Sequence, residues 1–291
     1  MDWITGPAEL RRRLASERSA GRAIGLVPTM GYLHRGHAAL MRALRPKVGC
    51  LVLSIFVNPT QFALGEDLAT YPRNLEADRQ LAESEGVDVV FSPTAEGMYP
   101  VPSSTFVMVE GLSSVLEGAS RPTHFRGVTT VVTKLLHVVQ PDLVVFGQKD
   151  AQQVVLVRRM LQELLFDTRM VVIPTVRDHD GLALSSRNAY LSSEERTAAL
   201  VLVQSLAEAT KVVQAGERDA RAVAELMGII IAGEPLAMLD YAVAVHASTL
   251  APVQTIDGKV LLAVAARFGR ARLLDNACLM VDGPSVSTVL P

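Results

Sequence analysis

Two histidines, His34 and His37, lie three residues apart, where a short apolar run gives way to a helix-like pattern. Side chains at this spacing share one face of a helix, and the first turn of a helix offers free N–H groups and a positive dipole end to anions. Imidazoles there can bond phosphate oxygens and stabilise charge that builds up on phosphorus. The alternatives are a metal pair or surface histidines, but two histidines supply too few ligands for a typical zinc site. We predict that this segment binds phosphate.

Amide side chains follow a second apolar run, within residues 58–62. Asn58 and Gln61 each offer a donor and an acceptor, so they can hold the hydroxyl and carboxylate groups of a small ligand. The alternative is a plain turn, because Asn-Pro sequences start turns routinely.

A third polar segment begins at Gly147, a residue type that lets another group approach the backbone closely. Lys149 is a compact cation suited to phosphate, and Gln153 is expected about one helical turn further along, facing the same way. The alternative is that Lys149 and Asp150 form a solvated ion pair in a loop.

A fourth segment, residues 184–188, contains Ser185, Ser186 and Arg187. Two hydroxyls and a guanidinium form a suitable phosphate clamp. The alternative is a helix-capping loop, in which serines are common.

Strands and helices must position these four segments. Apolar runs of strand length alternate with helix-like stretches, which predicts a parallel α/β sheet with both faces covered. Ligands of such sheets bind beyond the carboxyl ends of the strands, where the polar segments lie. The predicted strands are 23–27, 51–57, 87–91, 143–146 and 170–173, and the predicted helices are 35–44, 75–85, 127–139 and 151–164.

The pattern changes after residue 176. A helical region can be capped by Ser192 or Ser193, with Glu194 and Glu195 in its first turn. These features predict a smaller α+β domain, with the domain ranges 1–177 and 178–291. Its other predicted elements are a helix at 220–232 and β-like stretches at 241–246, 259–268 and 272–274.

Composition narrows the class of protein. The 291 residues are 49% hydrophobic and carry a net charge of −2, so no overall basic field favours nucleic acid or an anionic membrane. No apolar run approaches the ~18–20 residues of a membrane span. Cys50 and Cys278 are the cysteines, which favours a reducing compartment, and Cys50 is predicted to be a buried thiol. We expect a cytoplasmic protein.

Taken together, the polar segments resemble the pantothenate synthetase family, also called pantoate–β-alanine ligases. The His-x-Gly-His element alone is shared by many members of the nucleotidylyltransferase superfamily, whereas 58–62 together with 147–153 is more specific. Gln148 stands where many relatives have Glu. The matching segments are 28–37, 56–62, 71–73, 121–127, 147–153 and 185–191.

The resemblance implies a Rossmann-like nucleotide domain, a smaller C-terminal lid domain, a homodimer, and ATP with Mg²⁺. His37, His34, Lys149 and Arg187 would be catalytic, with His37 as general acid. Gln61, Gln153 and Asn58 would bind pantoate, with Gln61 also near β-alanine, and Asp78 would lie near the metal. The implied ATP-binding residues are Met30, Gly31, Tyr32, Leu33, His34, Arg35, Gly36, His37, Gly147, Gln148, Lys149, Asp150, Val176, Leu184, Ser185, Ser186 and Arg187.

The implied reaction has two steps. The pantoate carboxylate attacks the α-phosphorus of ATP and expels pyrophosphate, and the β-alanine amine then attacks the adenylate and releases AMP. A nucleotidylyltransferase that stops after nucleotide transfer would explain His34 and His37, but not Gln61 and Gln153 together. A silent ATP-binding module should lack a phosphate-contacting residue, and none is missing. A class I tRNA synthetase is disfavoured by size and by the absence of a basic RNA-binding region.

Overall fold

A computed structural model describes residues 1–63 and 66–291. The chain packs as two compact units, the first made of residues 1–147 and 156–173, the second of residues 148–155 and 174–291. The expected boundary between residues 177 and 178 falls slightly after this division. Residues 148–155, expected in the first domain, group with the second unit, because the Asn276 side chain bonds the backbone of Gln148 and Lys149.

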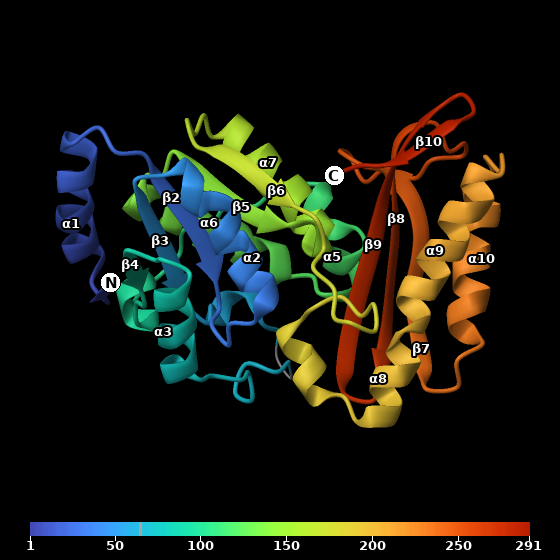
Figure 1. Cartoon of the computed structure of the whole chain (residues 1–291), viewed down its shortest axis with the longest axis horizontal. Helices are drawn as coiled ribbons and strands as arrows, with labels where there is room; N and C mark the ends of the chain where they lie inside the picture. Colours follow the sequence, from blue (N-terminus) through green and yellow to red (C-terminus); the bar gives the residue numbers. More distant parts are fainter. Residues whose placement is uncertain (64–65) are drawn as a thin grey trace. The chain divides into compact units, whose positions relative to one another are not determined.

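The described part of the first unit contains a six-stranded parallel sheet in the order β1-β4-β3-β2-β5-β6 (Figure 1). This confirms the predicted Rossmann-like sheet. Its strands are β1 (Asp2–Ile4), β2 (Ile24–Thr29), β3 (Cys50–Ile55), β4 (Val89–Phe91), β5 (Leu143–Gly147) and β6 (Arg169–Ile173). The accompanying helices are α1 (Pro7–Ser19), α2 (Arg35–Leu44), α3 (Leu75–Ser84), α4 (Ala95–Met98), α5 (Glu117–Ser120), α6 (His124–Val139) and α7 (Ala151–Glu163), with 3₁₀ turns η1 (Arg45–Lys47), η2 (Pro59–Gln61) and η3 (Leu112–Ser114).

The core of this unit follows from the apolar runs. Every residue of β3 is buried, as expected for a central strand covered on both faces. Met41 and Leu44, one helical turn apart on α2, pack with Leu51 and Leu53 of β3 in one cluster. Cys50 is the buried thiol that was predicted, and burial raises its pKa to about 11.

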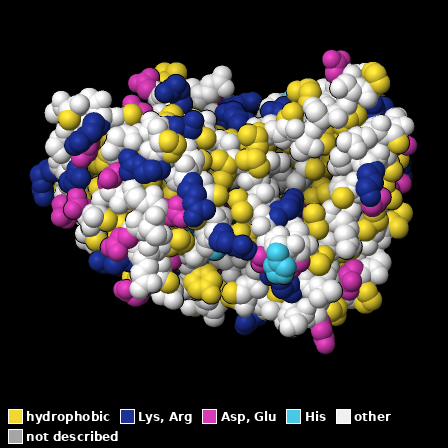
Figure 2. Space-filling model, in the orientation of Figure 1, with side chains coloured by type: hydrophobic (Ala, Val, Ile, Leu, Met, Phe, Trp, Pro, Cys, Tyr) yellow, Lys and Arg dark blue, Asp and Glu magenta, His cyan; other side chains and the backbone are white. Residues whose placement is uncertain are grey.

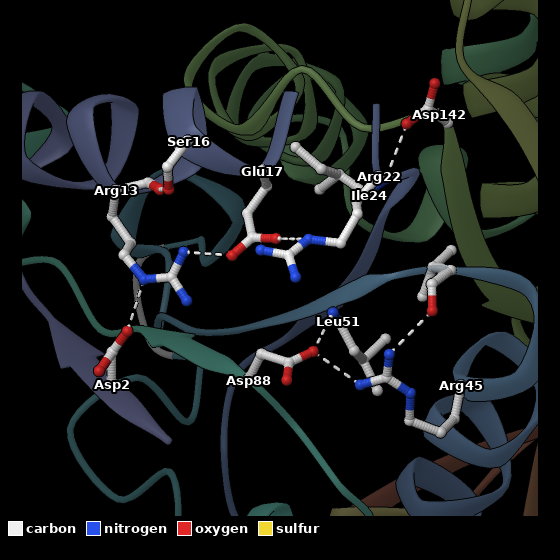
Figure 3. A network of polar contacts seen from close by, with 11 residues as sticks. Asp2, Arg13, Ser16, Glu17, Arg22, Ile24, Arg45, Leu51, Asp88 and Asp142 are labelled. Atoms are coloured by element: carbon white, nitrogen blue, oxygen red, sulfur yellow. Dashed lines mark hydrogen bonds and ion pairs between the residues drawn. The ribbon is translucent and has the colours of Figure 1, made fainter. Parts of the chain in front are cut away.

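Charged side chains hold the N-terminal edge of the sheet (Figure 3). Asp142 accepts the backbone N–H of Ile24 at 2.7 Å, where β2 begins. Asp88 accepts the N–H of Leu51 at 2.7 Å and pairs with Arg45 at 2.6 Å. These carboxylates satisfy strand-end donors that would otherwise lack a partner.

The strand order places a topological switch point between β2 and β5. The chain runs from β2 through β3 to β4 on one side and then returns to β5 on the other side of β2. In open α/β sheets, such a point is where ligands bind at the carboxyl ends of the strands. β2 leads directly into the His34–His37 segment, and β5 ends at Gly147.

The second unit is built on an antiparallel sheet in the order β10-β9-β8-β7. Ser192 caps α8 and forms a capping box with Glu195, which confirms the predicted helix start. β9 is much longer than the predicted stretch 272–274. The prediction ended too early because the polar pair Asp275 and Asn276 interrupts the apolar pattern of the strand. The elements are α8 (Ser193–Ala199), α9 (Val201–Gln214), α10 (Ala220–Ala232), β7 (Ala237–His246), β8 (Gly258–Phe268), β9 (Ala271–Asp282) and β10 (Ser285–Thr288), with 3₁₀ turns η4 (Gln148–Asp150) and η5 (Ser186–Tyr190).

Surface charge is mixed in sign. Basic and acidic side chains are both dispersed over the face shown in Figure 2, in keeping with the net charge of −2. Across residues 1–63 and 66–291, no helix combines the length and the apolar character needed to cross a membrane.

Candidate functional site

The loop after β2 is held in an unusual backbone conformation. Gly31 has φ +82° and Tyr32 has φ +50°, both in the left-handed region. Two side chains hold this turn: Thr29 Oγ1 accepts the N–H of Gly31, and Asp78 accepts the N–H groups of Tyr32 (Oδ2, 2.9 Å) and Leu33 (Oδ1, 2.6 Å). A β-carbon on residue 31 would lie 3.0 Å from Asp78 Oδ2, so a glycine suits both the conformation and the close approach.

Asp78 therefore anchors the loop, and its predicted place near the metal remains a prediction. Both carboxylate oxygens already accept backbone N–H groups, and the residue is 1% exposed. Burial raises the pKa of this carboxyl, while the two backbone hydrogen bonds oppose that shift. Within residues 1–63 and 66–291, no group of three or more His, Cys, Asp or Glu side chains is placed to hold a metal ion.

His34 and His37 cap the N-terminus of α2. The Nδ1 atom of His34 accepts the N–H of Gly36 at 3.1 Å, and Nδ1 of His37 accepts the N–H of His34 at 3.2 Å. The two ring centroids are 4.1 Å apart. Because each Nδ1 is an acceptor, the neutral imidazoles carry their proton on Nε2. Two N–H donors at the positive end of a helix suit an anion.

The amide segment after β3 is brought against this loop. Gln61 donates from Nε2 to the Sδ atom of Met30 at 3.0 Å and accepts at Oε1 from Asn58 Nδ2 at 3.1 Å. Asn58 Oδ1 accepts the hydroxyls of Tyr99 (2.8 Å) and Thr60 (3.0 Å). The predicted residues Met30, Asn58 and Gln61 thus form one connected set. Sequence reasoning missed Tyr99, which follows the short helix α4 and carries no motif of its own.

The backbone of Gln61 is fixed from the other side. Its carbonyl oxygen accepts from His124 Nδ1 at 3.0 Å and from Arg121 Nη2 at 3.4 Å. Arg121 also forms a bidentate pair with Glu66, at 2.6 and 2.7 Å. Burial, reinforced by the Arg121 charge, lowers the pKa of His124 to about 4, so this ring is neutral at pH 7 and donates from Nδ1.

In the second unit, Lys149 lies in the 3₁₀ turn η4, before α7 begins at Ala151. Lys149 and Gln153, which were expected about one turn apart on one helix, therefore lie in a 3₁₀ turn and in an α-helix. Lys149 Nζ lies 3.1 Å from Asp150 Oδ1, as in the alternative interpretation of a local ion pair. Asn276 Nδ2 donates to the carbonyl oxygens of Gln148 (3.0 Å) and Lys149 (2.9 Å).

Residues 176–184 of the second unit form a hairpin-like loop. The Leu184 N–H donates to the Val176 carbonyl at 2.9 Å, so these two predicted ATP-binding residues are adjacent. Arg177, which bridges to Ala183, makes a bidentate pair with Asp275 at 2.6 and 3.0 Å. The signal for Asp275 and Asn276 was present in the sequence as a polar pair between apolar β residues.

Ser185 Oγ accepts the N–H of Arg187 at 3.3 Å and caps the 3₁₀ turn η5. The capping alternative is therefore correct for the Ser185 side chain as it stands. The phosphate-clamp role of Ser185, Ser186 and Arg187 remains a prediction, as does the contact of Gln153 with pantoate.

Known proteins resemble this chain over nearly its whole length. A family model for pantoate–β-alanine ligase matches residues 2–278. The pantothenate synthetase of Moorella thermoacetica is 51% identical over 282 residues, which cover 97% of this chain and 100% of that protein.

Solved structures of proteins from the same family are also similar to this chain. Pantothenate synthetase from Thermus thermophilus is similar with a TM-score of 0.90 and 45% identity, covering 95% of this chain and 98% of that chain. Pantoate–β-alanine ligase from Francisella tularensis was crystallised with beta-gamma ATP and beta-alanine. It is similar with a TM-score of 0.76 and 31% identity, and the match covers 98% of this chain and 100% of that chain.

Proposed function

The chain belongs to the pantoate–β-alanine ligase family, and we propose that it condenses (R)-pantoate with β-alanine through a pantoyl-adenylate, releasing AMP and pyrophosphate. One observation carries most of the weight: the hydrogen-bonded set of Met30, Gln61 and Asn58 links the loop after β2 to the turn after β3. These strands are parallel neighbours, with Thr29 opposite Ile55. A phosphate-binding helix start and an amide pair at one sheet edge suit a reaction between ATP and a hydroxy acid.

In the proposed first step, a pantoate carboxylate oxygen attacks the α-phosphorus of ATP. The new P–O bond forms as the bond to pyrophosphate breaks, so protein side chains need only position the reactants and stabilise negative charge. We assign the Nε2–H groups of His34 and His37 to this task, with Lys149 and Arg187 as further cations. Gln61, Gln153 and Asn58 are assigned to pantoate, since amides match its hydroxyl and carboxylate groups.

In the proposed second step, the neutral amine of β-alanine attacks the acyl carbon of the adenylate. The C–N bond forms, the C–O bond to AMP breaks, and the amine loses a proton to solvent or to a nearby base. Gln61 is assigned to β-alanine as well as to pantoate. The family relative from Francisella tularensis, crystallised with beta-gamma ATP and beta-alanine, supports the choice of substrates.

Magnesium is proposed to enter as a complex with the phosphates of ATP. Asp78 is not assigned as its ligand, because both of its oxygens are bonded to the loop backbone. Neither proposed step requires a protein ligand to the metal. A homodimer and a cytoplasmic location complete the proposal, and light scattering of the purified chain tests the dimer.

Isotope exchange tests the order of the two steps. With pantoate, ATP and Mg²⁺ but no β-alanine, labelled pyrophosphate should enter ATP, because the adenylate forms reversibly. A ligase that forms an acyl phosphate would release ADP and show no exchange, and a simple nucleotidylyltransferase would not respond to pantoate. Exchange that appears only after β-alanine is added would refute the adenylate-first order.

A further inference from the structure

Two neighbouring residues of β9 contact two separate segments that lie close in the chain to Lys149 and Arg187, which the proposed function assigns to the reaction at ATP. Asp275 and Asn276 are 3% and 4% exposed, in the middle of a strand paired with β8. Consecutive strand residues point to opposite faces, so the two side chains can reach different parts of the second unit. Buried polar groups in a protein core are hydrogen-bonded, and both side chains have several partners in the second unit.

Asn276 holds the η4 turn by its backbone. Its Nδ2 group has two hydrogens, and donates to the carbonyl oxygens of Gln148 and Lys149 at 3.0 and 2.9 Å. Its Oδ1 accepts from Gln148 Nε2 at 3.4 Å. Fixing the carbonyl of Lys149 fixes the direction in which the flexible lysine side chain leaves the backbone. The contact therefore limits where the Lys149 ammonium can be.

Asp275 holds the loop that leads into residues 184–187. It binds Arg177 through both carboxylate oxygens, and Arg177 Nη1 also donates to the carbonyl of Gly181 at 3.2 Å. Asp275 Oδ1 further accepts the N–H of Asn276 at 2.8 Å, which couples the two side chains. A bidentate guanidinium–carboxylate pair is more specific in geometry than a single contact.

We propose that Asp275 and Asn276 are positioning residues for ATP, acting through Lys149 and through the loop that ends at Leu184. The inference rests on the proposed function, because that function assigns Lys149 and Arg187 to the reaction at ATP, and Arg187 follows shortly after this loop. Preorganised contacts raise affinity by removing the cost of ordering flexible groups when the ligand binds. Substitutions that disturb these contacts should weaken the binding of ATP more than the binding of pantoate or β-alanine.

The main test is Asn276→Asp in the full chain. The substitution preserves shape but places carboxylate oxygens opposite two carbonyl oxygens. The KM for ATP and the dissociation constant for ATP, measured by calorimetry, are expected to rise about tenfold, with the KM values for pantoate and β-alanine within twofold of wild type. Asp275→Asn, which keeps one acceptor for Arg177, should show a smaller shift in the same direction.

Asp240→Asn is the matched control. Asp240 pairs with Arg272 in the same sheet, so its substitution also removes an ion pair from the second unit. The KM and the dissociation constant for ATP of this variant should stay within twofold of wild type. Asn276→Ala, which removes the two donors without adding charge, undergoes the same measurements and replaces Asn276→Asp if the latter does not fold.

A purely structural role predicts a different pattern. The melting temperature and the active fraction would fall, while the dissociation constant for ATP of the folded protein would stay within twofold of wild type, and that result would overturn the inference. An equal loss of binding for ATP, pantoate and β-alanine would also overturn the inference. Failure of the proposed function is distinguishable, because a wild-type chain that makes no AMP from these substrates can still be compared with its variants by ATP binding.

Discussion

The backbone of Gly127 lies directly against that of Thr60. A β-carbon on residue 127 would come within 2.4 Å of the Thr60 carbonyl oxygen and 2.6 Å of the Gln61 Cα atom. The carbonyl oxygen of Gly127 also accepts from Asn58 Nδ2 at 3.1 Å. The first turn of α6 therefore packs against the 3₁₀ turn η2 with no space for a side chain, and this contact sets the position of Gln61.

Gly127→Ala should destabilise the protein and weaken pantoate binding. Two backbone segments would have to separate, at a cost of ~1–3 kcal/mol or more. Gly228→Ala is the control, because a β-carbon there meets its nearest atom, Leu239 Cδ2, at an ordinary 3.6 Å in the middle of α10. The control should gain up to ~1 kcal/mol from helix propensity. Urea unfolding of both variants measures the difference, and equal stabilities would contradict the packing argument.

Substitutions of the two histidines should separate helix capping from chemistry. Asparagine is a good N-cap residue, so His34→Asn should keep the melting temperature of wild type while losing pyrophosphate exchange. His37→Ala should lose about 10²–10³-fold in kcat/KM, or ~3–4 kcal/mol, by analogy with deleted donors to a developing anion. If His34→Asn retains a tenth or more of the wild-type exchange rate, its imidazole serves only as a cap.

Gln61→Ala should weaken the binding of pantoate far more than the binding of ATP. The loss is expected to be ~1–3 kcal/mol, because a buried polar group of the ligand is left without a partner. Gln153→Ala is expected to behave in the same way. Gln80→Ala, which removes an exposed glutamine bonded to Glu76 on α3, is the matched control. Calorimetry with each substrate decides, and an equal loss for pantoate and ATP would mean that Gln61 shapes the loop instead.

Asp78→Asn should disturb the loop that precedes α2. An amide has one acceptor oxygen, so either the Tyr32 or the Leu33 N–H loses its partner, with a cost of ~1–3 kcal/mol. We expect both lower stability and a higher KM for ATP. Asp88→Asn also removes a carboxylate that accepts a backbone N–H, but at the opposite edge of the sheet, so stability should fall without a change in that KM. A normal KM in Asp78→Asn would count against the anchoring role.

His124 should make the protein less stable in acid. Its folded-state pKa of about 4 lies below the ordinary 6.5, so the unfolded chain binds more protons between these values. Stability therefore rises with pH through this window and is lost as pH falls from about 6.5 to 4, by on the order of 2–3 kcal/mol. His124→Gln should flatten that slope, while substitution of His179, which is 86% exposed at its side chain, should not. Urea titrations at pH 4.5 and 7 give the comparison.

Features that depend on neighbours in the chain were predicted from the sequence alone. The bounds of α2, Arg35–Leu44, and of α10, Ala220–Ala232, match the predicted ranges, since helical periodicity and capping residues are local. The Ser192–Glu195 capping box is a further local feature. The parallel sheet followed from apolar runs of strand length, and every residue of its central strand β3 is buried. The family resemblance then supplied roles for side chains that spacing alone left open.

Contacts between distant segments were decided by the tertiary structure. Asp78 lies 46 residues from Tyr32, and Asn276 lies 128 residues from Gln148. In both cases the partner is a backbone N–H or carbonyl group. Every residue offers the carbonyl in the same form, and every residue except proline offers the N–H. Nothing in the residue types marks such a partner, and only the order of the strands brings it within hydrogen-bonding distance. The sequence therefore determined which chemical groups the protein carries and where its helices begin, whereas the fold determined that Asp78 anchors a loop and that a C-terminal strand holds Lys149.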